Sequence, residues 1–151
     1  MSATRPTFSR ALALVAVATV LALGGAAQQS SAEQASAAPN RVVMQVSDGD
    51  LGKWNLALNN ARNLQADLGA ANVEIEIVAY GPGLGMLKRD SAVASRIDEA
   101  LISGVKIVAC ENTMRAQKLA PSDMLPSIGY VGAGVVEIMQ RQQQGWSYLR
   151  P

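Results

Sequence analysis

The stretch from Val105 to Thr113, VKIVACENT, places an apolar run directly before the only cysteine of the chain and a polar triplet directly after it. The run is too short for a helix and too apolar for a half-exposed strand, so it predicts a buried strand of a parallel sheet. Asn112 and Thr113 are residue types that cap helices, which predicts a helix over Met114–Leu119. Cys110 is therefore expected at the carboxyl end of a strand, beside a helix N-terminus.

Strands and helices are expected to alternate along the chain on both sides of this stretch. Further strands are expected at Arg41–Val46, Asn72–Tyr80, Ile128–Val131 and Trp146–Leu149, and further helices at Leu51–Leu68, Ala92–Ser103 and Val135–Gln144. Strict alternation predicts one α/β domain with three α/β/α layers and a mainly parallel five-stranded sheet. Because Glu74 and Glu76 alternate with isoleucines, the second strand is predicted to be half exposed at a sheet edge. A flavodoxin-like strand order, 2-1-3-4-5, places it there.

In this order the first and third strands are neighbours, and their carboxyl ends form a crevice where α/β proteins bind ligands. The crevice is predicted to bring Ser47, Asp48 and Gly49 close to Cys110, Asn112 and Thr113. Backbone N–H groups and the helix dipole favour a thiolate there, whereas Glu111 and Asp48 oppose it. Arg115 is the nearest fixed positive charge. We expect an exposed, reactive thiol; the alternative is a small buried side chain that only packs.

The connection after the second strand reads Gly81-Pro-Gly-Leu-Gly85 and is followed by Lys88 and Arg89. Gly81, Gly83 and Gly85 allow close backbone approach and expose N–H groups, which together with the two cations are consistent with an anion site. The favoured interpretation is a long structural connection that requires positive φ, and the anion site is the alternative. The glycine spacing matches neither the dinucleotide-binding fingerprint nor a P-loop.

The first 38 residues are predicted to be a signal peptide and a flexible leader, which leaves a domain over residues 39–151. Two arginines and no acid precede an apolar run, Ala11–Leu23, that is short for a membrane span, and small residues follow it. We therefore expect a periplasmic or secreted protein without a membrane span after cleavage. The alternative is an uncleaved N-terminal anchor.

Composition excludes several classes of function. The chain has no histidine, which removes the commonest metal ligand and general base, and its single cysteine cannot form an internal disulfide. Residues 39–151 contain equal numbers of basic and acidic side chains. Nucleic acids and anionic membranes demand a basic excess, so neither is expected as a partner. We expect no metal and no cofactor. Near-neutral charge does little to oppose self-association.

Several features together resemble the DsrE/DsrF-like family. They are a strand ending in cysteine, a short helix with Arg115, Ala116 and Lys118, the segment Asp123–Pro126, and then a short strand and a last helix. The resemblance covers residues 41–151. It implies a compact three-layer fold, a homotrimer or homohexamer, and, as in the sulfur-relay branch, a persulfide on the cysteine that Cys110 matches by position.

Two functions are consistent with these observations. The first is a sulfur carrier whose Cys110 accepts a sulfane sulfur as a persulfide and exchanges it with a donor or acceptor protein. A carrier fits better than a multi-step transferase because no second cysteine or basic pocket is visible. The second is a non-catalytic oligomeric module that binds a small anion or a protein in the same crevice.

Overall fold

The structure is a computed structural model, and it describes residues 40–151. The predicted leader, residues 1–38, lies outside the described residues, so its cleavage and export stay predictions. The strands are β1 (Asn40–Val46), β2 (Val73–Ala79), β3 (Lys106–Cys110), β4 (Gly129–Val131) and β5 (Ser147–Leu149). The α-helices are α1 (Leu51–Leu68), α2 (Ala94–Ile102), α3 (Glu111–Ala116) and α4 (Gly134–Gln143). Three short 3₁₀ segments are η1 (Ala70–Asn72), η2 (Gly81–Leu87) and η3 (Pro121–Asp123).

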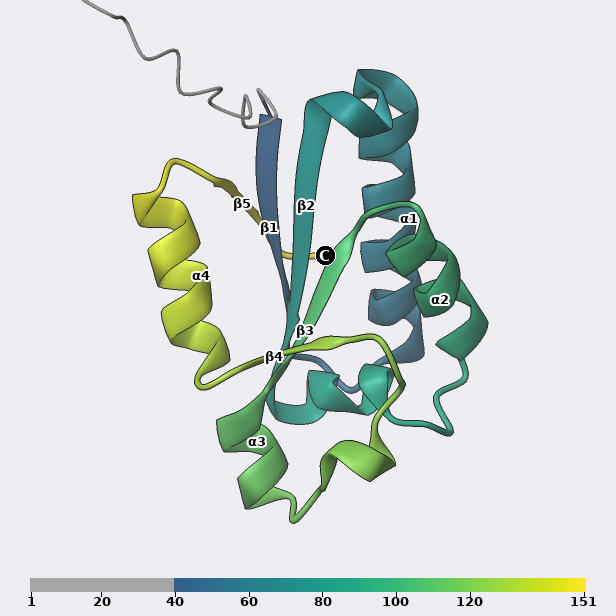
Figure 1. Ribbon diagram of the computed structural model, residues 1–151, viewed down its shortest axis with the longest axis vertical. Helices are drawn as coiled ribbons and strands as arrows, with labels where there is room; N and C mark the ends of the chain where they lie inside the picture. Colours follow the sequence, from purple (N-terminus) through teal and green to yellow (C-terminus); the bar gives the residue numbers. More distant parts are fainter. Residues whose placement is uncertain (1–39) are drawn as a thin grey trace, which may run out of the picture. The chain divides into compact units, whose positions relative to one another are not determined.

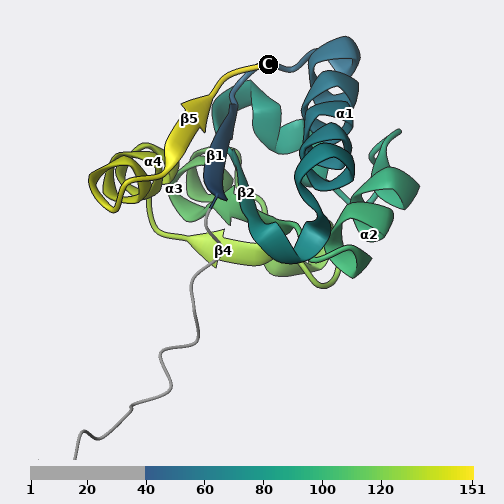
Figure 2. The ribbon, with the colours of Figure 1, turned by 90° about the horizontal axis from the view of Figure 1, so that it is seen from above.

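The five strands form one sheet in which all neighbours are parallel, as Figure 1 shows. Helices α1 and α2 cover one face, and α4 covers the other (Figure 2). The predicted α/β fold with helices on both faces of a parallel sheet is therefore confirmed. Within residues 40–151 no helix is both long enough and apolar enough to cross a bilayer.

The predicted strand order is wrong. The observed order is β4-β3-β2-β1-β5, so β2 is the central strand and separates β1 from β3. The acidic alternation in β2 reflects ion pairs rather than an edge position. Glu74 pairs with Lys106 Nζ of β3 at 2.5 Å, and Glu76 pairs with Arg141 Nη2 of α4 at 2.6 Å. Ion pairs let a carboxylate occupy a position that its sequence pattern assigns to solvent.

Helix α1 matches its predicted bounds because its ends and its apolar face are all encoded locally. The Asp50 side chain accepts the backbone N–H of Lys53 at 2.8 Å, which caps the first turn, and Gly69 ends the helix with a φ of 86°. Leu58 and Ala61 are buried against the sheet. The indole N–H of Trp54 donates to the Asp48 carbonyl at 2.7 Å and fastens the helix to the end of β1.

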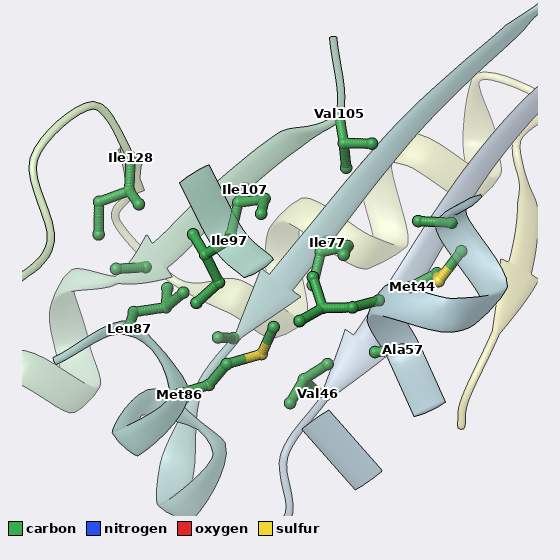
Figure 3. Packing of buried hydrophobic residues seen from close by; sticks show 14 of the residues in the cluster. Met44, Val46, Ala57, Ile77, Met86, Leu87, Ile97, Val105, Ile107 and Ile128 are labelled. Atoms are coloured by element: carbon green, nitrogen blue, oxygen red, sulfur yellow. The ribbon is translucent and has the colours of Figure 1, made fainter. Parts of the chain in front are cut away.

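The two faces of the sheet have cores of different size. The larger cluster lies under α1 and α2 and includes Met44, Ile77 and Met86, which Figure 3 shows together with other buried side chains of this cluster. The smaller cluster, under α4, contains only four buried residues: Val43, Val78, Ile138 and Trp146. Most of the apolar burial that stabilises the domain therefore lies on the α1 and α2 face.

Two helices begin at positions that differ from the prediction. Helix α2 begins at Ala94 instead of Ala92, because the Ser91 hydroxyl accepts the Val93 N–H in a turn that precedes the helix. Helix α3 begins at Glu111, directly after β3, with Cys110 itself in the N-cap position. Asn112 and Thr113 thus lie inside the first turn and are not its caps, which leaves their side chains free for other contacts.

Candidate functional site

The Cys110 thiol lies at the point where β3 ends and α3 and α4 both begin. Its Sγ accepts the backbone N–H of Gly134, the first residue of α4, at 3.2 Å. A Cβ at Gly134 would lie 3.2 Å from atoms of both Tyr80 and Val78, so a larger residue would push the α4 N-terminus away from the sheet. The glycine therefore permits the close approach that delivers this N–H group to the sulfur.

Thr113 connects the thiol to the loop that follows β2. Its Oγ1 accepts the Gly81 backbone N–H at 3.0 Å. Because this bond occupies a lone pair of the hydroxyl, the Thr113 proton is available to the Cys110 sulfur, and the interaction with this hydroxyl lowers the thiol pKa. Gly81 and Thr113 are thus in direct contact.

The hydrogen bonds around Sγ set its charge. Burial raises the pKa of the Cys110 thiol, but donation from the Thr113 hydroxyl and from the backbone N–H groups of Gly134, Thr113 and Asn112 outweighs it. The net result is a pKa below the ordinary value of a cysteine. Hydrogen bonds that favour the charged form are the usual route to an activated thiolate in proteins. The site therefore stabilises a nucleophilic sulfur.

The thiol is buried, and the prediction of an exposed cysteine is wrong. Only 4% of the Cys110 surface is exposed. The connection from β4 to α4 covers the sulfur and is held there by a hydrogen bond from the Asn112 N–H to the Gly132 carbonyl at 3.1 Å. Cys110 belongs to neither apolar cluster of the described residues, and the Gly134 N–H group contacts its sulfur directly.

Ser47, Asp48 and Gly49 lie farther along the same sheet edge, because β2 intervenes between β1 and β3. The Ser47 carbonyl accepts the Gly83 N–H at 3.2 Å, and a Cβ on Gly49 would lie 3.3 Å from Pro82. The Asp48 carboxylate lies 3.4 Å from the Arg150 guanidinium. The segment after β1 therefore contacts η2 and approaches Cys110 only through that loop.

The three glycines of η2 have separate packing roles. Gly81 has a φ of 54°, which an L-residue rarely adopts. A Cβ on Gly83 would lie 2.2 Å from the Val46 carbonyl oxygen, and one on Gly85 would lie 3.2 Å from the Trp54 ring. The N–H groups of Gly81 and Gly83 bond within the protein, which favours the structural interpretation of the loop over the anion site.

Arg115 and Asn112 form the wall of a hollow next to the thiol. The Arg115 guanidinium donates to the Asn112 side-chain oxygen. Both residues line a cavity of about 350 Å³ between α3 and α4, together with Gly132, Ala133 and Val136. The β4–α4 connection, Gly132 and Ala133, forms one side of this hollow, and Cys110 itself does not line it.

Sequence reasoning missed Gly134, the residue whose N–H contacts Sγ. The available signal was the run Gly132-Ala-Gly134 directly before a predicted helix, a composition that suits close approach of a helix N-terminus to a ligand. Within residues 40–151 no three potential metal-binding side chains gather at one place. The nucleophilic group of the site is the single thiol, whose pKa is lowered by its hydrogen-bond donors.

Comparisons with other proteins place this geometry in a family. Residues 41–151 match the DsrE/DsrF-like family. The fold is similar to that of MTH1491 from Methanobacterium thermoautotrophicum, a protein of unknown function, with a TM-score of 0.71 and 40% identity over 74% of this chain and 99% of that chain.

Two more distant structures share the fold. They are BT1422 of Bacteroides thetaiotaomicron (TM-score 0.59, 18% identity, 78% of this chain and 99% of that chain) and the ychN protein of E. coli (TM-score 0.59, 12% identity, 74% and 99%). A comparison with functionally curated proteins gave no match.

Proposed function

Because the chain belongs to the DsrE/DsrF-like family, we propose that it is a sulfur carrier that holds a persulfide on Cys110. The observation that carries this proposal is the donor set around Sγ: the Gly134 N–H at 3.2 Å and the Thr113 hydroxyl, whose orientation the Gly81 N–H determines. These donors lower the pKa of the thiol despite its burial. Such a sulfur is suited to nucleophilic attack and to holding a negatively charged persulfide.

The proposed reaction is a single displacement at sulfur. With thiosulfate as donor, the Cys110 thiolate attacks the outer sulfur, a new S–S bond forms on Cys110, and the S–S bond of thiosulfate breaks with its electron pair leaving on sulfite. No proton or external oxidant is needed. The total charge of the thiolate and thiosulfate equals that of the persulfide anion and sulfite. Transfer to an acceptor thiolate is the same displacement in the next step.

The experiment is mass spectrometry of the protein after incubation with thiosulfate or polysulfide. We expect a gain of about 32 daltons, one sulfur atom, that a thiol reductant removes. Addition of two oxygen atoms gives a similar mass, but a reductant does not reverse it. Cys110→Ser is the matched control and should gain nothing. Absence of a reductant-labile adduct on the wild-type protein would exclude the carrier function.

The alternative is a binding module without sulfur chemistry, and the 4% exposure of Cys110 is the observation that favours it. In that case the hollow lined by Asn112 and Arg115 receives the ligand, and Cys110 only supports its wall. Small oxyanions such as sulfate are suitable probes because Arg115 offers a positive charge. Sulfate binding that is equal in wild type and Cys110→Ser, without any sulfur adduct, would favour this function.

We propose further that the protein is exported after removal of a signal peptide. The support is the charge and apolar pattern of residues 1–38. N-terminal sequencing of protein isolated from its native cell envelope should therefore give a first residue between positions 28 and 41. A chain that begins at Met1 or Ser2 would contradict cleavage.

Self-assembly into a trimer or hexamer is also proposed. Its support is an apolar strip on the outer side of α4, where Val135, Val136 and Met139 are exposed, and Tyr148 on β5 is exposed as well. Trp146, near Tyr148 in the sequence, is buried under α4 and does not contribute to this surface. Light scattering at micromolar concentration should give a multiple of the monomer mass; a monomer would contradict this proposal.

A further inference from the structure

Glu76 is the one charged side chain that is buried among residues 40–151, with only 1% of its surface exposed. It lies at the centre of the sheet, on the face that α4 covers. Arg141 Nη2 approaches its Oε2 at 2.6 Å, but without the alignment of a hydrogen bond, and its Oε1 has no donor at all. A buried carboxylate oxygen without a donor costs free energy, so this group is expected to have a second state.

The cation beside Glu76 is shared with another carboxylate. Arg141 Nε lies 2.8 Å from Glu137 Oε1, and its guanidinium stacks on the Trp146 ring at 4.7 Å. Two carboxylates therefore compete for one guanidinium in a partly buried place. Burial raises the pKa of Glu76; Arg141 opposes this shift, and Glu137 adds to it. A proton on Glu76 removes the excess negative charge and supplies a donor toward Glu137.

The other charged groups of this face are held elsewhere. Lys106, the register partner of Glu76 on β3, pairs with Glu74 at 2.5 Å. Arg41 of β1 donates to the Gln144 carbonyl at 2.8 Å. Tyr130 of β4 is the remaining titratable group, and it lines a cavity of about 520 Å³ together with Lys106, Glu76, Glu137 and Arg141. In the described part of the chain, Glu76 thus shares Arg141 with Glu137 and gains no cation of its own.

Helix α4 joins this charge cluster to the thiol. Its last turn carries Arg141, its first turn carries Glu137, and its first residue, Gly134, donates its N–H to Cys110 Sγ. Besides these polar contacts, the apolar packing under α4 consists of four buried residues and the partly buried Tyr80, Val108 and Val131. Ionisation of Glu76 under α4 therefore affects a helix whose attachment to the sheet involves little apolar burial, so a change in this charge can displace it.

We propose that α4 is a proton-sensitive cover over Cys110, which stays docked while Glu76 is protonated and loosens when Glu76 ionises. The functional role of this motion rests on the proposed function, because exposing the thiol matters only if Cys110 reacts with a sulfur donor. The motion itself does not depend on it. The docked state binds the proton more tightly than the loosened state, in which Glu76 is hydrated. Docking is therefore complete at low pH and weakens as pH rises through the folded-state pKa of Glu76.

The test is hydrogen exchange of the full chain across mildly acid to mildly alkaline pH, corrected for the intrinsic exchange rate. Amides of α4 should lose protection as pH rises, by up to about ten-fold per pH unit for one linked proton. Amides of α1 serve as the internal reference and should not follow this trend. In parallel, the alkylation rate of Cys110, divided by its thiolate fraction, should rise with α4 exchange.

Glu76→Gln keeps the size of the side chain and removes its titration. We expect α4 protection in this variant to be independent of pH and equal to that of the wild type at low pH. Glu74→Gln is the matched control, since Glu74 lies two residues away on the same face but is partly exposed; it should retain the wild-type pH dependence. Glu137→Gln is a second test, in which the pH dependence should shrink because Arg141 is no longer shared.

The proposal is overturned if α4 and α1 show the same pH dependence, if Glu76→Gln keeps it, or if Glu74→Gln removes it. If Glu76→Gln does not fold, the Glu137→Gln variant decides instead: an unchanged pH dependence of α4 exchange in that variant also overturns the proposal. Sulfur transfer does not enter these exchange measurements. A protein that shows the α4 transition but takes up no sulfur would therefore refute the carrier function and leave the proton-sensitive cover standing.

Discussion

The two faces of the sheet are built from different chemistry. Under α1 and α2, buried side chains such as Met44, Ile75 and Ile77 form a continuous apolar cluster. Under α4, a four-residue apolar cluster shares the face with the Glu76–Arg141 ion pair and with the Cys110 thiol. Apolar burial is therefore concentrated on one face, and the other face carries the buried ion pair and the thiol. The domain can change its α4 face without losing its main core.

Strand periodicity explains how one sheet carries both kinds of face. Along β1, Val42 and Met44 point toward α1, whereas Val43 belongs to the cluster under α4. Along β2, Ile75 and Ile77 alternate in the same way with Glu76. The alternation of residues within each strand thus assigns apolar and polar side chains to different faces. Only the order of the strands in the sheet determines which polar positions become neighbours.

The largest expected effects come from truncating the same residue type on each face. Ile77→Ala should lower the free energy of unfolding by about 4 kcal/mol, because Ile77 is fully buried in the larger cluster and the cavity cannot close. Ile138→Ala should cost about 2 kcal/mol, because α4 can settle onto the sheet. Urea-induced unfolding measures both. Equal losses would mean that the two faces contribute alike to stability.

Glycines provide a second comparison of the two faces. Gly83→Ala should destabilise the domain by about 2 to 3 kcal/mol, because its Cβ would meet the Val46 carbonyl oxygen at 2.2 Å. At Gly132, on the connection that covers the thiol, an added Cβ meets no atom within 4 Å, and the change should be within about 0.5 kcal/mol of neutral. Thermal unfolding of both variants checks this, and a tolerated Gly83→Ala would contradict the described packing of η2.

Removing the Thr113 hydroxyl should alter the thiol more than the fold. Thr113→Val removes the hydroxyl that helps to lower the thiol pKa at nearly constant side-chain volume, so this pKa should rise and alkylation should shift to higher pH. Selective isotope labelling of the single cysteine allows NMR to follow this titration directly. Thr113→Ser should restore the wild-type pKa. Asn112→Ala, whose side chain contacts Arg115 instead, is the matched control and should not change it.

The smallest effect on folding is expected on the outer side of α4. Val136→Glu places a charge at an exposed position, so the free energy of unfolding of the single chain should change by no more than about 0.5 kcal/mol. If this strip is the contact between copies, the same substitution should lower the particle mass measured by light scattering. An assembly of unchanged mass would place the contact on another surface.

The amino-acid sequence alone was sufficient for the α/β class, for most element bounds and for the place of Cys110 at the end of a strand. These features depend on local information: the Asp50 cap and Gly69 stop of α1, the apolar run before Cys110, and the alternation of strand and helix. Each is encoded within a few residues of where it acts, so no knowledge of distant contacts was required.

Strand order, the burial of Cys110 and the Gly134 contact were decided by tertiary structure. The sequence pattern of Glu76 is that of an exposed residue, yet Arg141, 65 positions later, pairs with it in the centre of the sheet. Similarly, Gly134 reaches Sγ only because β4 lies beside β3 and turns α4 back over the other face. Whether a polar group is hydrated or buried depends on contact partners that are far apart in the chain, and a local sequence pattern does not identify these partners.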